Sequence, residues 1–412
     1  MRWAPIACFW RKAIEPLVLR AGTMRIGISA HFWPRLTSGS GQYLRSLAQE
    51  LAHLPTPHTF TLIGEPGAFA DGPPPLEAVE VPRIPLPAGR PAKLYFEQVA
   101  IPWAARRLGL DLLHIPYLAP PLLSPVPTVV TVHDLITWLL PAYRGPLRKR
   151  AYTWLDLQAA RRARALIAVS HHTRQDIVRH LHYPADRIYV TYEAAAPDLR
   201  PAATEAIAAV RRRYDLPERF VLYLGDTDRR KGLPRLMGAL AQYQRTHPQD
   251  VVGLVIAGPL HRPDGRLFED LPGIAKALGL AGHTHFLGPI PEKDKAALYS
   301  AATVFALLSE YEGFGLTPLE AMACGTAVLA SAASSLPEVV GEAGLLVDPS
   351  DEAAVATALE RLLLDPDLRA DLGRRGRERA ATFSWERTAR ETLAVYEAAM
   401  DFRAQRSRGN VQ

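Results

Sequence analysis

The segment SEYEGFGLTPLEAMACG at residues 309–325 connects a short apolar run at 303–308 to a helical pattern. The run, TVFALL, has the length and composition of a buried strand. After the strand comes a Gly-Phe-Gly loop and a helix, with Thr317 expected at the N-cap, Pro318 at the first helical position and Gly325 at the C-cap. Loop amides and a helix N-terminus both favour negative charge, so this junction is expected to bind an anion.

Two carboxylates, Glu312 and Glu320, flank this loop with seven residues between them. Glu320 is either the acid of a capping box, which satisfies amides at the helix start, or a residue that binds a ligand. Glu312 is either a solvated loop residue or a second ligand-binding residue. Their spacing alone does not separate these interpretations, because short motifs match by chance.

Length and composition restrict the class of protein. A chain of 412 residues exceeds what one hydrophobic core supports, so two domains are expected. Its 48% apolar and 22% charged residues are typical of a soluble globular enzyme. The two cysteines, Cys8 and Cys324, argue for a reducing compartment and against a disulfide framework. No apolar run approaches the length of a membrane span.

The charge is uneven along the chain. Residues 1–200 carry 23 Lys and Arg against 14 Asp and Glu, whereas residues 201–412 carry 25 against 28. The basic residues include a cluster from Trp138 to Arg150 and three further arginines, Arg161, Arg162 and Arg164. This cluster is either a solvated helix face or a surface that binds an acceptor phosphate or an anionic membrane.

The first half begins with a strand–loop–helix unit. A strand at 25–29 precedes the glycine loop with Gly39 and Gly41, and an amphipathic helix follows. This unit opens a doubly wound α/β domain. The third small residue of a dinucleotide fingerprint is replaced by Leu44, which argues against a nicotinamide dehydrogenase. Further buried strands are expected at 112–115, 128–132 and 166–170.

His133 and Asp134 follow the strand at 128–132. Ligands bind beyond the carboxyl ends of parallel strands, so this position predicts a site residue. The alternative is a structural histidine with Asp134 as a helix cap. The pair His171-His172 is interpreted as a helix start, because no further metal ligands lie at suitable spacing.

The second half repeats this architecture, with a basic loop at 225–232 after a strand at 220–224. The loop contains Asp226-x-Asp228, the type of pair that holds a divalent metal, and also Arg230-Lys231. Arginine offers a forked donor and lysine a compact charge, and both suit a diphosphate. The two interpretations predict opposite responses to a chelator.

Three stretches resemble one family. EGFGLTPLEAMACGTAV at 312–328, LYLGDTDRRKG at 222–232 and PTVVTVHDL at 127–135 resemble motifs of the retaining glycosyltransferases of family four. The resemblance covers nearly everything from Met24 to Phe402. It departs from some relatives at Asp226, where they carry an arginine.

The resemblance implies an α/β architecture of the GT-B type, with two doubly wound Rossmann-like domains facing each other across a cleft and a C-terminal helix that crosses back to the N-domain. The expected limits are an extension at 1–23, an acceptor-side domain at 24–198, a nucleotide-sugar domain at 199–385, and the returning helix and tail at 386–412.

The implied activity is retaining, metal-independent transfer of a hexose, with mannose favoured, to a glycan or lipid-linked acceptor. The implied donor is a nucleoside-diphosphate sugar, GDP-mannose in the first place and a UDP-sugar otherwise. Neither a cofactor nor a nucleic-acid partner is expected, and the expected location is the cytoplasm or the inner face of the membrane. The rival functions are a sugar-nucleotide epimerase of the same fold and a non-catalytic subunit that binds nucleotide sugars.

The resemblance also implies roles for individual residues. Arg230 and Lys231 are expected to stabilise the leaving diphosphate, Glu312 to hold sugar hydroxyls, and His133 to contact the sugar from the other side. The expected donor-binding residues are Gly39, Gly41, Gly313, Phe314, Gly315, Leu316 and Glu320, the last of these on the ribose.

Overall fold

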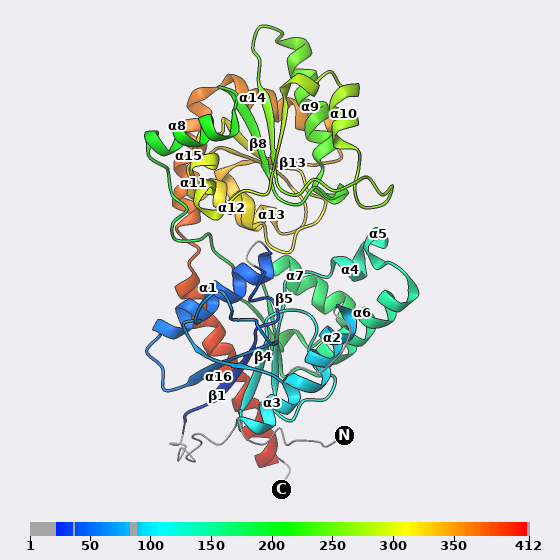
Figure 1. The fold of residues 1–412 in the computed structure, drawn as a ribbon, viewed down its shortest axis with the longest axis vertical. Coiled ribbons are helices and arrows are strands. Elements are labelled where there is room, and N and C mark those ends of the chain that lie inside the picture. The colour runs from blue at the N-terminus through cyan, green and yellow to red at the C-terminus, as the bar shows by residue number, and fades with distance from the viewer. Residues whose placement is uncertain (1–21, 36–37, 83–88, 410–412) are drawn as a thin grey trace, which may run out of the picture.

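The computed structural model describes residues 22–35, 38–82 and 89–409, and side chains up to Asp401. The extension expected at 1–23 therefore lies almost entirely outside the described residues. Two parallel sheets, each covered by helices on both faces, form the two lobes in Figure 1. In the described part of the chain no helix combines the length and hydropathy needed to cross a bilayer.

The N-terminal sheet has the strand order β3-β2-β1-β4-β5-β6-β7. Its strands are β1 (Arg25–Ser29), β2 (Thr59–Gly64), β3 (Glu77–Glu80), β4 (Leu112–Ile115), β5 (Thr128–Val132), β6 (Ala165–Ala168) and β7 (Ile188–Val190). Its helices and turns are α1 (Gly39–His53), α2 (Arg90–Tyr95), η2 (Phe96–Ala100), α3 (Ile101–Arg107), α4 (Ile136–Leu139), α5 (Pro141–Arg144), α6 (Leu147–Ala160), α7 (His171–Asp176), η3 (Ile177–Leu181) and η4 (Ala185–Arg187).

The C-terminal sheet has the strand order β10-β9-β8-β11-β12-β13. Its strands are β8 (Phe220–Leu224), β9 (Gly253–Ala257), β10 (Thr284–Gly288), β11 (Val304–Leu307), β12 (Val328–Ser331) and β13 (Leu345–Val347). Its helices and turns are α8 (Thr204–Tyr214), η5 (Arg229–Lys231), α9 (Leu233–Thr246), α10 (Leu271–Ala277), η6 (Ala281–His283), α11 (Glu292–Ala301), α12 (Leu316–Ala323), α13 (Leu336–Val340), η7 (Gly341–Ala343), α14 (Glu352–Leu364), α15 (Pro366–Ala380) and α16 (Trp385–Gly409).

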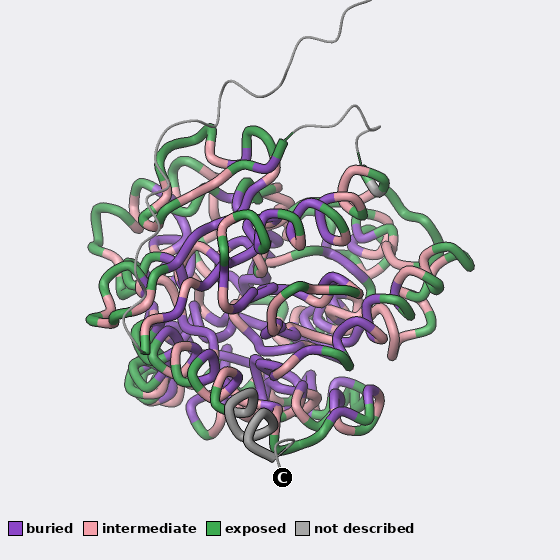
Figure 2. Tube along the Cα trace, turned by 90° about the horizontal axis from the view of Figure 1, so that it is seen from below, coloured by how far each residue is buried: buried purple, intermediate pink, exposed green. Residues whose placement is uncertain are grey.

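The central strands form because they are apolar throughout. β5 (TVVTV) and β8 (FVLYL) are buried at every position, which a sheet covered on both faces requires. The amphipathic helix α1 buries Tyr43, Leu44 and Leu47 against its sheet and is capped by Ser38, whose side chain accepts from the Gly41 amide. Figure 2, seen from below, shows the buried residues running through the middle of the molecule.

The last helix, α16, leaves the C-terminal lobe and packs against α1, β5 and β6 of the N-terminal lobe, where Figure 1 draws it in red. Tyr396 is fully buried there, and its hydroxyl lies 2.7 Å from His114 Nδ1. The α/β class, the two Rossmann-like sheets and the returning helix predicted from the sequence are confirmed. The domain limits at 198 and 385 stay predictions.

Candidate functional site

The site begins where the strand order of the C-terminal sheet reverses. β8 and β11 are neighbours there, and their connections run to opposite sides of the sheet. Such a switch point leaves a crevice beyond the carboxyl ends of the two strands, where α/β proteins bind ligands. The loop after β8 carries the basic residues at 229–231 and the loop after β11 carries Glu312. A hydrogen bond from the Glu310 amide to the Arg230 carbonyl, at 2.8 Å, ties the two loops together.

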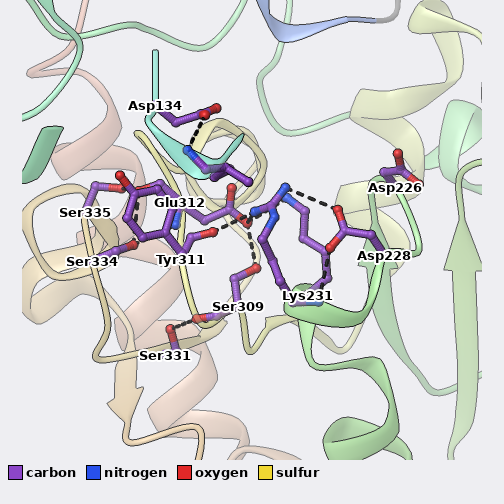
Figure 3. A network of polar contacts seen from close by, with 12 residues as sticks. Asp134, Asp226, Asp228, Lys231, Ser309, Tyr311, Glu312, Ser331, Ser334 and Ser335 are labelled. Atoms are coloured by element: carbon purple, nitrogen blue, oxygen red, sulfur yellow. Dashed lines mark hydrogen bonds and ion pairs between the residues drawn. The ribbon is translucent and has the colours of Figure 1, made fainter. Parts of the chain in front are cut away.

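Three charged side chains converge between these loops (Figure 3). Lys231 Nζ donates to Glu312 Oε1 at 2.6 Å, and Arg230 Nη1 lies 3.2 Å from the same oxygen. Ser309 Oγ also donates to this oxygen, at 2.6 Å. Each of the three charged side chains is only 12–14% exposed. The structure therefore brings Arg230, Lys231 and Glu312, which are up to 82 residues apart in the chain, into one cluster.

The two cations keep Glu312 ionised. Burial by itself would raise the pKa of the Glu312 carboxyl, but the charges of Lys231 and Arg230 and the hydrogen bonds from Lys231 and Ser309 outweigh it and lower the pKa to about 2. The carboxylate is thus negative at neutral pH and occupies the position between the two cations. An anionic ligand that enters the crevice meets cations already paired with this carboxylate.

The two aspartates of the basic loop have separate partners. Asp228 caps η5 by accepting from the Arg230 amide at 3.1 Å, and its Oδ2 lies 3.3 Å from Arg230 Nη2. Its Oδ1 accepts a 2.6 Å hydrogen bond from the hydroxyl of Tyr143, which comes from α5 in the other lobe. Asp226 is half exposed and accepts from His261 Nε2 at 2.9 Å. Among the described residues no group of three or more side chains has the arrangement of a metal site.

The Gly-Phe-Gly loop is packed directly against the N-terminal lobe. The Gly313 carbonyl accepts from Ser170 Oγ at 2.6 Å and from Thr173 Oγ1 at 3.1 Å. A Cβ on Gly313 would lie 1.8 Å from the His133 carbonyl oxygen, so only glycine fits. The Phe314 ring is buried between Tyr192 and Phe383, so its expected contact with a donor could come only from its backbone.

The capping prediction for the following helix is wrong. Helix α12 begins at Leu316, with Gly315 at the N-cap and no side-chain cap, because Gly315 turns the chain into the helix with a φ of 118°. Thr317 is therefore a helical residue. Glu320 lies more than a turn inside and accepts from the Tyr299 hydroxyl at 2.7 Å instead of capping an amide. Burial raises the pKa of this carboxyl, and Lys295 Nζ, 3.9 Å away, offsets part of that rise.

An open pocket of about 580 Å³ is lined by residues of both lobes. The loop after β8 contributes Gly225 and Asp226 to its lining, whereas Arg230, Lys231 and Glu312 do not line it. Its lining residues come from the start of α1, the ends of β8 and β9 with the loops that follow them, and the start of α11: Ser38, Gly39, Leu224, Gly225, Asp226, Ala257, Gly258, Pro259, Pro289, Ile290, Glu292 and Lys295. A Cβ on Gly39 would meet nothing within 4 Å, whereas one on Gly41 would lie 2.0 Å from the Arg35 carbonyl oxygen. The two predicted glycines therefore have different roles. Gly39 lines the pocket, whereas Gly41 allows the helix start to pack closely against the Arg35 carbonyl. Glu320 does not line the pocket itself, but its carboxylate lies 3.9 Å from Nζ of Lys295, which does.

His133 lies at the end of β5 with both ring nitrogens occupied. Nδ1 is 2.9 Å from Glu193 Oε1 and Nε2 is 3.0 Å from the Pro116 carbonyl oxygen. A carbonyl and a carboxylate only accept, so the protonated ring, which donates from both nitrogens, satisfies both partners. Burial alone would lower the pKa of His133, but the hydrogen bond and charge of Glu193 and the Pro116 carbonyl together raise it. Any contact between His133 and a sugar therefore competes with these two partners.

Sequence reasoning missed Glu193, because it lies 60 residues from His133 and opens a stretch without periodicity. Its position soon after β7, at the same sheet edge, was the available signal. Sequence reasoning also missed Tyr143 and Glu338, which join the two lobes. The Glu338 carboxylate accepts from the amides of His171 and His172 at 2.9 and 2.7 Å. The helix start predicted at His171 is confirmed.

Two family descriptions match the chain. Glycosyltransferase Family 4 matches residues 37–198, and glycosyl transferases group 1 matches residues 209–379. O-antigen chain mannosyltransferase B of Escherichia coli is 34% identical over 271 residues, which is 65% of this chain and 69% of that protein. D-inositol 3-phosphate glycosyltransferase of Corynebacterium jeikeium is 37% identical over 201 residues, and the match spans 48% of each chain.

Solved structures have the same fold over most of the chain. Sucrose-phosphate synthase from Thermosynechococcus elongatus superposes with a TM-score of 0.72 at 25% identity, covering 92% of this chain and 99% of that one. Anabaena HepE in complex with UDP-glucose superposes with a TM-score of 0.71 at 19% identity, covering 91% and 100%. At the lower identity the likeness concerns the fold alone.

Proposed function

Because the chain belongs to the glycosyltransferases of group 1 and family 4, we propose that it moves a hexose from a nucleoside-diphosphate sugar to a glycan or lipid-linked acceptor, with retention at the anomeric carbon. Mannose is the favoured hexose, since the relative from Escherichia coli is named a mannosyltransferase. GDP-mannose is the favoured donor. A UDP-sugar is the alternative, since a structural neighbour is described with UDP-glucose.

One observation carries the proposal: Arg230 and Lys231 converge on a single oxygen of Glu312 at the switch point. A diphosphate is the ligand that two adjacent cations suit best, because it spreads negative charge over several oxygens. A donor diphosphate would replace the Glu312 carboxylate between the cations. Glu312 would then be free to accept hydrogen bonds from the hydroxyls of the sugar.

The same cations support the chemical step. As the bond from the anomeric carbon to the diphosphate oxygen breaks, negative charge grows on the leaving group and positive charge on the sugar ring. Cations held in place before the reaction stabilise the leaving group without reorganisation. Arg230 is fixed by Asp228, and Asp228 is held by Tyr143, so the position of Arg230 depends on contact between the lobes. We propose that this arrangement makes a bridging metal unnecessary.

The test is a panel of nucleotide sugars, including GDP-mannose, GDP-glucose, UDP-glucose and UDP-galactose. Release of the free nucleoside diphosphate is measured with and without a mannosylated acceptor, and the anomeric configuration of the product is determined by NMR. GDP-mannose is expected to give the highest rate and an α-linked product. A product with inverted configuration would refute retention. Turnover to an epimerised nucleotide sugar without an acceptor would replace the transferase proposal with the epimerase.

A further inference from the structure

The N-terminal lobe contains a second open cavity, which we call the arginine cavity. Its volume is about 750 Å³, against about 580 Å³ for the pocket lined by both lobes. It is lined by the whole loop at 121–128, by the end of α6 with the turn after it, and by Arg187. Sites for small molecules have volumes of roughly 300–1,000 Å³, so the arginine cavity is large enough for such a ligand.

The arginine cavity lies away from the donor site. β5 starts within its lining, and Arg164 and Arg187 come directly before β6 and β7. At their other ends β5 and β6 lead to His133 and Ser170, which meet Gly313 of the C-terminal lobe. The cavity is therefore at the amino ends of the strands, on the edge of the sheet opposite the C-terminal lobe in Figure 1.

Three arginines and no acidic residue are found among the residues that line this cavity. Arg162 and Arg164 follow α6, whereas Arg187 ends η4. Burial raises the pKa of the Tyr183 hydroxyl, and the charges of Arg187 and Arg164 both oppose that rise, so the two guanidinium groups lie near one buried oxygen. The acid that acts on the same hydroxyl is the exposed Asp186. Positive charge is therefore in excess at this place.

Helix capping explains only part of this arrangement. Arginines after a helix offset its dipole, and Arg162 Nη1 donates to the Leu122 carbonyl at 3.2 Å. Arg187 belongs to a different element, so the dipole of α6 does not account for it. Like charges around one cavity repel each other, and an anionic ligand would remove that repulsion. A guanidinium group has five N–H donors, so it can bind a phosphate while it keeps a contact to the fold.

The loop at 121–128 gives the cavity a fixed apolar wall. Three of its eight residues are prolines, which restrict the backbone, and leucine and valine supply three more. The Leu122 amide donates to Gln98 Oε1 at 2.8 Å, and Ser124 Oγ donates to the Val126 carbonyl at 2.7 Å. The Leu123 side chain is 77% exposed. A wall that is ordered before binding reduces the entropy lost when a ligand binds.

We propose that the arginine cavity binds a soluble nucleotide, with the phosphate on the arginines and the base against the apolar loop. Arginine forks match phosphate oxygens, and small-molecule sites combine apolar walls with a few polar groups. Inorganic phosphate would leave the exposed Leu123 in water. A sugar phosphate would turn hydroxyls toward a wall with few polar partners. This site is separate from the donor site and does not depend on the proposed function.

The experiment is calorimetric titration of the full chain with adenosine monophosphate (AMP), and with inorganic phosphate and adenosine as partial ligands. AMP is expected to bind at least roughly ten-fold more tightly than either part, because each part makes only one of the two kinds of contact. Hydrogen exchange measured by mass spectrometry locates the ligand. Exchange should slow at 121–128 and 159–164 when AMP is bound.

Substitutions in the lining test the contacts separately. Arg164→Gln/Arg187→Gln should weaken AMP binding at least roughly ten-fold, and Arg164→Lys/Arg187→Lys should fall between this variant and the parent, since lysine keeps the charge but loses the fork. Arg162→Gln tests the same prediction at an exposed position, where the change does not threaten folding. Leu123→Gln should reduce the preference for AMP over inorganic phosphate.

Two controls keep the cavity intact. Arg148→Gln/Arg179→Gln removes two exposed arginines of the same lobe that do not line the cavity, and Lys231→Ala changes the donor site. Both variants should bind AMP like the parent chain. Circular dichroism and thermal unfolding verify that each variant is folded.

Four results would overturn the proposal. The first is the absence of AMP binding up to about 10 mM. The second is an equal loss of binding in the controls and the cavity variants. The third is protection from exchange at 225–232 in place of 121–128. The fourth is binding to vesicles with phosphatidylglycerol that requires Arg162 while AMP does not bind, which would assign the arginines to a lipid phosphate.

Discussion

Replacing Lys231 by alanine is expected to lower the transfer rate on the order of 10²-fold or more, whether or not a chelator is present. Lys231 supplies one of the two cations on the Glu312 oxygen, at 2.6 Å. A hydrogen bond to a charged group contributes about 1.5–3 kcal/mol, which corresponds to roughly a 10- to 150-fold loss of donor affinity. Removing one preorganised contact to a growing charge costs on the order of 10²–10³-fold in rate, so kcat should fall along with the affinity.

The same change should affect stability little. Glu312 keeps the hydrogen bond from Ser309 and the ion pair with Arg230 at 3.2 Å, so its buried carboxylate still has a hydrogen-bond donor and a cation as partners. The free energy of unfolding should therefore fall by less than about 1 kcal/mol. A variant that loses activity because it fails to fold is recognised by its denaturant curve.

The assay is initial-rate transfer with the best donor, run untreated, with chelator, and with chelator followed by excess magnesium or manganese. Arg229→Ala is the matched control, because Arg229 belongs to the same turn but its side chain is about two-thirds exposed and pairs with Glu269. Asp226→Asn should also be mild, since the described partner of the Asp226 carboxylate is the exposed His261 ring, and the backbone carbonyl that accepts from the Tyr223 hydroxyl is unchanged. An enzyme that chelator inactivates and metal restores would refute the reasoning.

Three other changes test the remaining contacts. Glu320→Ala leaves the buried Tyr299 hydroxyl without its acceptor and should cost about 1–3 kcal/mol in urea unfolding; a donor affinity equal to that of the parent would remove Glu320 from the donor site. Tyr143→Phe breaks the hydrogen bond across the cleft and should lower kcat/KM about 5- to 10-fold with little change in unfolding, and unchanged kinetics would show that the lobes do not need it. Glu193→Gln removes the charge that raises the pKa of His133, so the parent should exceed the variant in stability most below about pH 6, and the difference should shrink as pH rises through the raised pKa. NMR titration of the ring checks the last prediction, and an equal pKa in both chains would contradict it.

The sequence alone determined the class of fold, because burial in a doubly wound sheet imposes a local pattern. Strands covered on both faces must be apolar at nearly every position, as in β5 and β8, and each must end in a loop that turns toward a helix. The basic loop with Lys231 and the glycine loop with Glu312 were recognisable as well, through their resemblance to the motifs of one family. Both are short contiguous stretches whose residues act near one another in the chain.

The tertiary structure alone decided how these residues meet. Lys231 donates to a Glu312 oxygen only because β8 and β11 are neighbours in the sheet, and His133 bonds to Glu193 only because β5 and β7 end at the same edge. The cap predicted at Thr317 failed because a left-handed glycine set the start of the helix. Hydrogen bonds and ion pairs depend on distances of about 3 Å between atoms, and the folded chain brings such atoms together from positions 60 to 140 residues apart, a separation that no local pattern records.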